Sequence, residues 1–518
     1  MTPKSTPRTA LTRIVTTMLV ASALSATAAH AATFQYRHPI MGMVASPTAQ
    51  AQQAATEILV ALTGGPALPA GEVNWPYSYD LKQLLSVTGD PSYNASNVSW
   101  ELQSGTLPAG LSLGTDGVLS GIPTTKDTVG SSFQVKATYK TKTGQQAYTI
   151  VVNGAVLHVT QISAGYAHTC AVTTSGGAKC WGDDSKGQLG DDAALTRRPT
   201  PVDVYGLTSG VVSISAGTNH TCAVTTSGGL KCWGYDADGQ LGNITGNTVK
   251  PTPEDVYGLT SGVVSVSAGW AHTCAVTTAG GVKCWGQDTV GQLGNDTTLS
   301  NMATPVDVQG LTSGVASVSA GAYHTCALLT SGGLKCWGYD SSGQLGNDGV
   351  ATNKPTPVDV QGLTSGVVSV SAGGSHTCAI TAGGGLKCWG LDTYGQLGND
   401  IPIALKYTPV DVQGLTSGAA RVSAGYTHTC AITTGGGLKC WGRDIYGQIG
   451  DNASLTDQPT PVDVSGLTSG VLSVSAGGHH TCALLASGGL KCWGLDTSGQ
   501  LGDSTSLSNQ ATPVDVAP

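Results

Sequence analysis

One phrase recurs seven times in this chain and restricts its fold more than any other feature. At its first occurrence it reads HTCAVTTSGGAKCWG, at residues 168–182, and GQLG follows at 187–190. The first cysteine of the phrase falls at 170, 222, 274, 326, 378, 430 and 482, a constant step of 52 residues. A fixed period of this length predicts a solenoid or a propeller.

The phrase itself predicts a β-hairpin. A run of Thr, Val and Cys precedes Ser-Gly-Gly, and Lys-Cys-Trp follows it, which is the pattern of two short strands around a tight turn. If the turn centres on Ser175, Cys170 lies opposite Cys180 and Val172 lies opposite Ala178. Because side chains alternate along a strand, both cysteines then share one face of the hairpin.

The N-terminus has the pattern of an export signal. Lys4, Arg8 and Arg13 precede a mostly apolar or small stretch at 14–26, and Ala-His-Ala at 29–31 is a small-x-small cleavage site. A membrane anchor is the alternative, but the apolar run is short for a bilayer, and no other stretch approaches the required length. The mature chain is therefore expected to have no membrane span.

This pattern divides the N-terminal region. We expect a signal peptide at 1–31 and a linker at 32–55. The mature protein is then exported, to the periplasm, the cell surface or the extracellular space. In such oxidising compartments evenly spaced cysteines form disulfides.

The chain has 14 cysteines, two in each repeat. Pairing within each hairpin closes a loop of about 11 residues, for which the chain-entropy model gives roughly 3 kcal/mol. The alternative hypothesis is a zinc site, because His168 and Cys170 share a face of the hairpin and Cys180 lies opposite, so the three could bind one ion. We expect no metal or other cofactor, since close C-x-x-C pairs and an evident fourth ligand are missing. The predicted disulfide residues are Cys170, Cys180, Cys222, Cys232, Cys274, Cys284, Cys326, Cys336, Cys378, Cys388, Cys430, Cys440, Cys482 and Cys492.

Residues 56–153 lack the 52-residue repeat and have a different sequence pattern. Strand patterns occur at 57–62, 133–139 and 148–152, with Gly/Pro turns between them, which favours a β-sandwich. The run LPAGLSL…DGVLSGIPT at 107–124 resembles the immunoglobulin-like domains of bacterial secreted and surface proteins. Such domains are spacers or adhesion modules, so the resemblance implies no chemistry.

Residues 157–518 contain the repeats, and each repeat has four strand patterns. In the second repeat they are 211–215, 221–225, 230–233 and 252–256, here termed A, B, C and D. Four short antiparallel strands repeated seven times predict a seven-bladed β-propeller, so the whole chain is expected to be all-β. The Ala-Gly after strand A suits a crowded inner position, and the recurrent Trp181 suits packing between blades. Each repeat has its own four strand patterns, so ring closure is expected to depend on packing of the first blade against the last, unless strands are shared between blades.

The pattern GxxHTCAxxxxGGxKCWGxDxxGQLG resembles the repeat of the regulator of chromosome condensation family, in all seven units. This resemblance implies the same propeller fold. The chain departs from the family in its regular cysteine pairs and in an Asp where Asn is more usual. That residue recurs as Asp184, Asp236, Asp288, Asp340, Asp392, Asp444 and Asp496.

Other recurrent polar residues are expected to be structural, because a repeated residue is explained by the repeated fold. Each recurrent His is expected to satisfy backbone groups of its own blade. Each Asp184 equivalent is expected to form a side-chain-to-backbone turn. The Lys before each second cysteine and the Asp of each PVDV or PEDV are expected to be cross-strand partners or solvated edge charges. The recurrent histidines are His168, His220, His272, His324, His376, His428 and His480.

No catalytic set is evident, and nucleic-acid binding is not expected. The net charge is −8, and no cluster of Lys and Arg provides a basic face. We find no nucleophile with a base and an orienting group in one repeat, and no Gly-rich phosphate loop followed by Lys-Ser/Thr.

The variable loops predict a binding face. Alternate strand directions place the A–B and C–D loops on one face of the disc, and the B–C and D–A loops on the other. The second set is monotonous, whereas the first varies and is rich in hot-spot residue types. The predicted binding residues are Tyr166, Tyr235, Trp270, Tyr323, Tyr339, Tyr394, Tyr426, Arg443, Tyr446 and His479.

These observations predict an exported, non-catalytic protein that binds a protein partner or cell-surface ligand. Three alternatives stay open. The first is inhibition of a secreted enzyme, as in propeller-type β-lactamase inhibitors. The second is guanine-nucleotide exchange, which the constant step of 52 residues disfavours because it leaves no room for an insertion. The third is an undetected enzyme.

Overall fold

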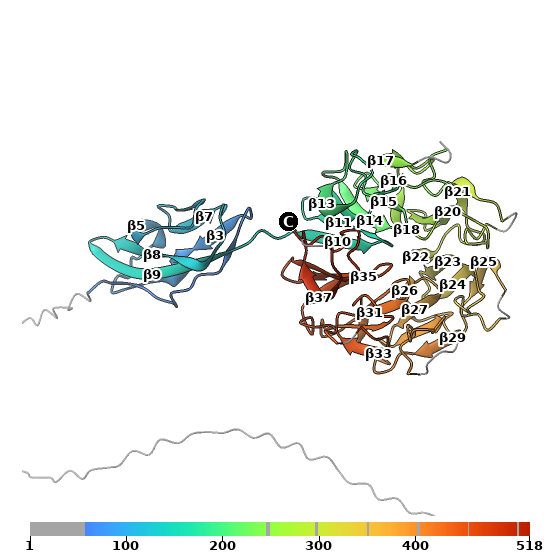
Figure 1. Ribbon diagram of the computed structural model, residues 1–518. Helices are drawn as coiled ribbons and strands as arrows, with labels where there is room; N and C mark the ends of the chain where they lie inside the picture. The colour runs from blue at the N-terminus through green and yellow to red at the C-terminus, as the bar shows by residue number, and fades with distance from the viewer. Residues whose placement is uncertain are drawn as a thin grey trace, which may run out of the picture. The chain divides into compact units, whose positions relative to one another are not determined.

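The computed structural model describes residues 57–244, 249–295, 299–349, 352–400, 405–453, 455–504 and 507–518. The predicted signal peptide and linker lie outside these residues. Within them the protein is built from strands and two short 3-10 helices, which confirms the predicted all-β class (Figure 1). No helix in the described part is long and apolar enough to cross a membrane.

The N-terminal region forms a β-sandwich. Its sheets have the strand orders β2-β9-β8-β5, β3-β7-β6 and β1-β4, and β2 pairs with β9 in parallel. Leu81, Leu119, Val135 and Ile150 are fully buried in one core that draws on these sheets. The elements are β1 (Leu59–Leu62), β2 (Gly71–Glu72), β3 (Tyr77–Asp80), η1 (Leu81–Leu84), β4 (Leu85–Thr88), η2 (Ala95–Asn97), β5 (Val98–Gly105), β6 (Leu111–Leu113), β7 (Val118–Gly121), β8 (Asp127–Tyr139) and β9 (Lys142–Asn153).

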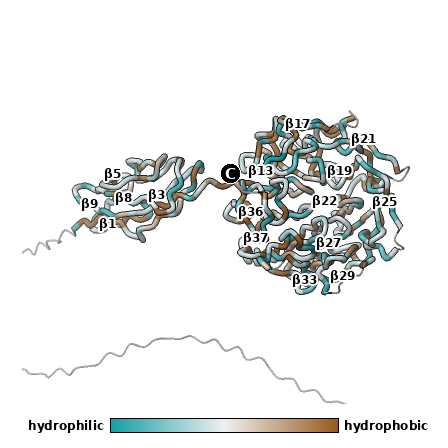
Figure 2. The backbone as a smooth tube through the Cα atoms, in the orientation of Figure 1, coloured by the Kyte–Doolittle hydropathy of each residue, from teal (hydrophilic) through white to brown (hydrophobic). Residues whose placement is uncertain are grey.

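The repeats form a propeller. Across the described residues of this region, consecutive strands make seven four-stranded antiparallel sheets, one per repeat, as the sequence predicts. The sheets follow one another around a ring (Figure 1). Hydrophobic and hydrophilic residues alternate over short distances along the blades (Figure 2).

The strands of the first four blades are β10 (Val159–Ala164), β11 (His168–Thr173), β12 (Ala178–Gly182) and β13 (Arg198–Asp203); β14 (Val211–Ala216), β15 (His220–Thr225), β16 (Leu230–Gly234) and β17 (Lys250–Asp255); β18 (Val263–Ala268), β19 (His272–Thr277), β20 (Val282–Gly286) and β21 (Met302–Asp307); β22 (Val315–Ala320), β23 (His324–Leu329), β24 (Leu334–Gly338) and β25 (Lys354–Asp359). Those of the last three are β26 (Val367–Ala372), β27 (His376–Thr381), β28 (Leu386–Gly390) and β29 (Lys406–Asp411); β30 (Ala419–Ala424), β31 (His428–Thr433), β32 (Leu438–Gly442) and β33 (Gln458–Asp463); β34 (Val471–Ala476), β35 (His480–Leu485), β36 (Leu490–Gly494) and β37 (Gln510–Asp515).

The hairpin has the predicted register. Cys170 pairs with Cys180 and Val172 with Ala178 across β11 and β12, and the equivalent pairs recur in every blade. Each cysteine pair forms a disulfide, which confirms one bridge per blade. The zinc interpretation is wrong, because these sulfur atoms are bonded to each other.

The predicted cross-strand partners on C and D form ion pairs. Lys179 contacts Asp203 at 2.8 Å, and the six equivalent pairs have Nζ–Oδ1 distances of 2.7 Å. The Asp side chains are more than half exposed, so each pair contributes at most about 1 kcal/mol.

Trp181 and its equivalents join neighbouring blades, as the sequence predicts. The indole of Trp233 is fully buried, and its Nε1 donates to the carbonyl of Gln188 in the preceding blade at 2.9 Å. Gly190 has a φ of +72°, and a Cβ there would lie 2.6 Å from this Nε1. The same Trp–Gln bond recurs around the ring at 2.9–3.0 Å. A buried donor therefore finds its acceptor only when the adjacent blade is in place.

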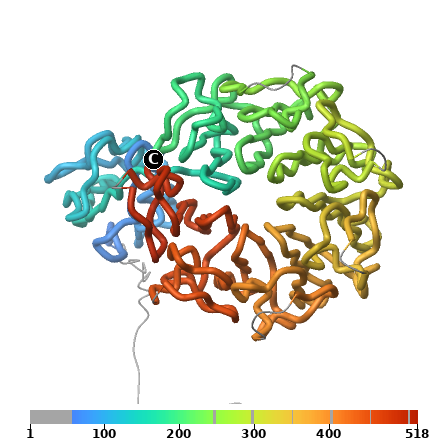
Figure 3. The backbone as a smooth tube through the Cα atoms, turned by 45° about the vertical axis from the view of Figure 1, so that its right-hand side comes forward, coloured from blue at the N-terminus to red at the C-terminus, as the bar shows by residue number. Residues whose placement is uncertain are grey.

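The ring closes by packing of complete blades, as predicted. The last blade lies beside the first (Figure 3). Trp181 Nε1 donates to the Gln500 carbonyl at 3.0 Å, and Ala164 N–H donates to Ser475 Oγ at 2.9 Å. These are the same bonds that join the other neighbours, so the closing interface is equivalent to the rest.

Candidate binding surface

The A–B loops meet at the propeller axis, and backbone hydrogen bonds hold them there. In each blade the residue two positions before the recurrent His donates its N–H to the glycine carbonyl of the next blade. Tyr166 bonds to Gly217 in this way at 3.1 Å, and Gly478 bonds to Gly165 at 3.0 Å, which completes the circle. The side chains at this position are therefore fixed around one axis.

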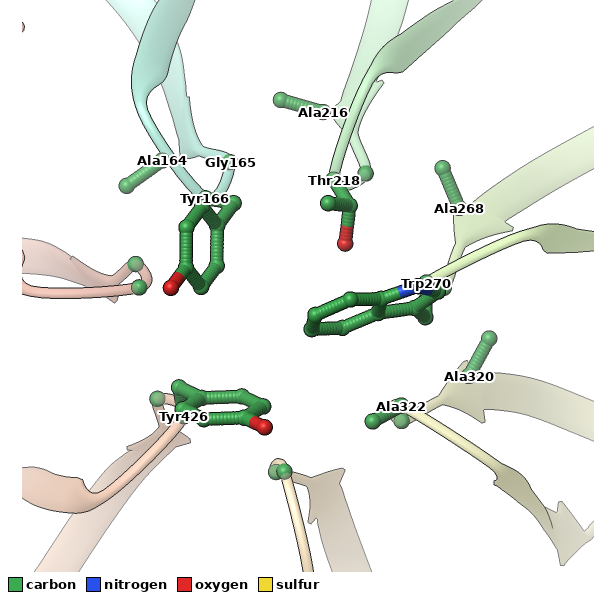
Figure 4. A pocket seen from close by; sticks show the side chains of 18 of the residues that line it. Ala164, Gly165, Tyr166, Ala216, Thr218, Ala268, Trp270, Ala320, Ala322 and Tyr426 are labelled. Atoms are coloured by element: carbon green, nitrogen blue, oxygen red, sulfur yellow. The ribbon is translucent and has the colours of Figure 1, made fainter. Parts of the chain in front are cut away.

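A small pocket of about 90 Å³ lies on this axis. Its wall is the Ala-Gly step of all seven blades, which confirms the expected crowded inner position. Tyr166, Trp270 and Tyr426 extend over it toward the centre (Figure 4). The ring centroids of these three residues lie 5.7 Å from one another in each pair. The rings are thus in contact, so they leave no space between them for a ligand.

Further rings extend this contact across the A–B and C–D loops. His479 lies 5.4 Å from Tyr166 and 5.2 Å from Tyr446, between ring centroids. On the other side, Trp270 stacks on Tyr323 at 5.8 Å, and Tyr323 contacts Tyr339 at 6.2 Å. The continuous set, termed the aromatic cluster from here on, consists of Tyr166, Trp270, Tyr323, Tyr339, Tyr426, Tyr446 and His479.

Two glycines make room for the central rings. A Cβ on Gly374 would lie 2.8 Å from the ring of Tyr426 and 2.3 Å from its carbonyl oxygen. A Cβ on Gly478 would meet Tyr166 in the same way. The tyrosines of blades 6 and 1 therefore lean over glycines of the preceding blades, which holds their rings near the axis.

The other three predicted binding residues form two cation–π pairs. The guanidinium carbon of Arg443 lies 4.5 Å from the centroid of Tyr394. The Nζ of Lys186 lies 5.4 Å from that of Tyr235. The ten predicted residues thus fall into one continuous cluster and two flanking pairs.

All ten predicted side chains are half-buried, so each keeps some exposed surface and none is fully buried between blades. Burial raises the pKa of Tyr166 and of Tyr323 above the usual value. Burial, and secondarily the charge of Arg443, lowers the pKa of His479. At neutral pH the cluster therefore presents uncharged rings with polar hydroxyl edges, a surface suited to protein contacts.

The recurrent histidines belong to the scaffold, but the partner expected from the sequence is wrong. The Nε2 of His168 lies 2.9 Å from the hydroxyl of Thr221 in the next blade, instead of bonding backbone of its own blade. This hydroxyl donates to the Gln188 carbonyl at 2.8 Å, so it accepts from the imidazole. The pattern recurs in every blade, and His480 with Thr169 completes it. Burial lowers the pKa of His168 to about 4, so the ring is neutral.

The predicted binding residues do not include a pair of exposed tyrosines on the other face of the propeller. Tyr205 and Tyr257 lie in the D–A loops of the first two blades, and each is 60% exposed. The D–A loops were judged uniform from the Gly-Leu-Thr-Ser-Gly that follows these tyrosines, so the residue before that sequence was not considered. Their position on the face opposite the aromatic cluster makes them an internal comparison for any binding experiment.

Comparison with known proteins identifies both regions. The family model "RCC1-like domain" matches residues 120–400 and 196–517, and the model "Putative Ig domain" matches residues 58–153. The ultraviolet-B receptor UVR8 of Arabidopsis thaliana is 33% identical over 355 residues, covering 67% of this chain and 79% of the receptor. The secretion-regulating guanine nucleotide exchange factor of Bos taurus is 30% identical, covering 65% of this chain and 77% of that protein.

Two further similarities are narrower. The human E3 ubiquitin-protein ligase HERC2 is 30% identical over 66% of this chain, but this chain spans only 7% of HERC2. Among solved structures, Prp20p from Saccharomyces cerevisiae has a TM-score of 0.60 at 22% identity, over 70% of this chain and 88% of that one. This structural similarity establishes the fold alone.

Proposed function

Because the chain belongs to the RCC1-like domain family, we propose that it is an exported binding protein that holds a protein partner against the aromatic cluster. The seven disulfides and the immunoglobulin-like domain fit an extracellular setting. The bovine relative is named as a guanine nucleotide exchange factor, and that activity is stated of the bovine protein alone. For this chain we disfavour exchange, because the constant 52-residue step leaves no inserted segment to enter a nucleotide site.

One observation carries the proposal: five of the seven blades contribute partly exposed rings to one continuous set of contacts around the axis. Contiguous exposed aromatic surface is costly in water and is typical of interaction sites. The scaffold does not need these rings, since the equivalent positions in other blades are Thr218 and Ala322. Their rigid placement also limits the side-chain entropy lost on binding.

We propose a non-catalytic role on the same grounds. The recurrent His, Thr and Gln groups are used in bonds between blades, and the recurrent cysteines are used in disulfides. The variable face is dominated by the aromatic rings, with Arg443 and Lys186 beside them, and these are contact groups more than reacting groups.

Affinity measurements on matched variants test the proposal. A partner captured from culture fluid or the cell envelope by the chain lacking residues 1–31 should bind Trp270→Ala and Tyr426→Ala variants at least about tenfold more weakly, with little change in melting temperature. Tyr205→Ala and Tyr257→Ala variants should retain the wild-type affinity, since these residues lie on the other face. An equal loss from the second pair would refute the proposed surface.

A further inference from the structure

Arg443 is a cation beside the aromatic cluster, and it has no counter-ion in the part of the chain that the structure describes. Its guanidinium lies over Tyr394, and none of the ion pairs among the described residues includes it. The Nε is buried and has no hydrogen-bond partner among those residues, while the side chain as a whole is partly exposed. The terminal nitrogens are thus the donors that a ligand can reach.

The neighbouring polar groups also lack hydrogen-bond partners among the described residues. The backbone N–H of Arg443 donates to the carbonyl of Thr427 at 3.1 Å, so these residues are adjacent. The buried hydroxyl of Thr427 and the buried Nδ1 of His479 have no partner in the described part of the chain. His479 Nε2 lies 3.4 Å from the Tyr166 hydroxyl. If that hydroxyl donates, the free Nδ1 carries the proton, and this corner of the cluster holds several donors.

The same loop position in the other blades holds one charged residue, Asp183, and among the described residues it forms no ion pair with Arg443. The position is occupied by Asp183, Tyr235, Gln287, Tyr339, Leu391 and Leu495. The carboxylate of Asp183 already accepts from Ser185 at 2.9 Å and from Gln188 at 2.8 Å within its own blade. An aromatic surface with one uncompensated arginine complements an apolar surface that carries one acid.

We infer that Arg443 binds a carboxylate of a protein segment that seats its apolar residues on the aromatic cluster. This inference rests on the proposed function and adds the chemistry of the partner. Arg presents a planar set of donors that matches a carboxylate, and stacking on Tyr394 holds that plane in place. A polyanion fits less well, because the site offers one cation and the whole chain has a net charge of −8.

Randomised short peptides displayed on phage provide the probe. The full chain lacking its predicted signal peptide should select peptides with Asp or Glu beside aromatic or aliphatic residues. For a selected peptide, Arg443→Gln should weaken binding about tenfold, equivalent to about 1.4 kcal/mol. A peptide with its acid changed to the amide should bind wild type and Arg443→Gln equally, which is the coupling expected of a direct contact. Arg421→Gln is the matched control, because it removes one exposed arginine from the same blade outside the aromatic cluster.

The outcomes separate the two proposals. If selected peptides require Trp270 and Tyr426 but lack acidic residues, the aromatic surface binds and the carboxylate inference is wrong. The inference is also overturned if the acid-to-amide change weakens binding to wild type and Arg443→Gln equally. If no peptide is selected, or if selected peptides bind Trp270→Ala and Tyr426→Ala undiminished, the proposed function itself fails.

Discussion

The recurrent polar residues have strongly shifted pKa values for structural reasons. Burial lowers the pKa of His220 to about 3 and raises that of Asp392 to about 6. Perturbed groups of this kind often mark active sites. Here each one recurs in every blade with the same partner, so the perturbation follows from packing between strands and blades.

The sequence predicted the role of the Asp better than that of the His. Asp392 Oδ1 accepts from the N–H of Leu397 at 2.9 Å, which is the expected side-chain-to-backbone turn. Such a turn involves only residues that are close in the chain, so it can be predicted from the local sequence. The partner of His220 is Thr273 in the next blade. That contact depends on the distance and rotation between blades, which no local pattern specifies.

Replacing Asp392 with Asn tests the cost of the buried carboxyl. Its pKa is about 6 in the folded protein, against 3.8 when unperturbed, so the folded state holds a proton that the unfolded state releases. The protonated carboxyl of Asp392 therefore makes its full contribution to the free energy of unfolding below pH 3.8, and this contribution is lost as the pH rises through about 6. Asn does not titrate, so the melting temperature of Asp392→Asn relative to wild type should increase from pH 4 to pH 7, corresponding to roughly 3 kcal/mol at most. A difference that stays constant with pH would show that the carboxyl is not buried as described.

At the scale of the element, the hairpin is the unit that the sequence specifies most completely. Its turn, strand register and disulfide were all predictable, because a Gly-containing turn fixes which residues face each other. The loops that follow were not predictable, since the same short turn presents Leu391 in one blade and Arg443 in the next.

Removing one disulfide should lower stability without opening the ring. The Cys378→Ala, Cys388→Ala double variant loses a buried bridge that closes a short loop, and it should cost about 2–4 kcal/mol. Lys387→Gln is a control in the same hairpin; it breaks an exposed ion pair and should cost at most about 1 kcal/mol. Thermal melting of both variants measures the contrast. Equal melting temperatures would mean that the bridge adds nothing to the blade.

At the scale of the whole molecule, seven nearly identical blades carry a binding face whose side chains differ from blade to blade. The Trp–Gln and His–Thr bonds are the same at every interface, including the closing one. The residues two before each recurrent His differ, from Tyr166 and Trp270 to Gly374 and Gly478. The sequence predicted that these loops share a face. It did not predict which rings touch, because that depends on how far each loop reaches toward the axis.

The central claim is that the aromatic cluster is the face that meets a partner. Hydroxyl-radical footprinting of the chain with its captured partner tests this directly, because aromatic side chains on both faces have exposed surface and should react in the free protein. The account predicts that Trp270 and Tyr426 become protected in the complex while Tyr205 and Tyr257 react as before. Protection of Tyr205 and Tyr257, with Trp270 and Tyr426 unchanged, would contradict it.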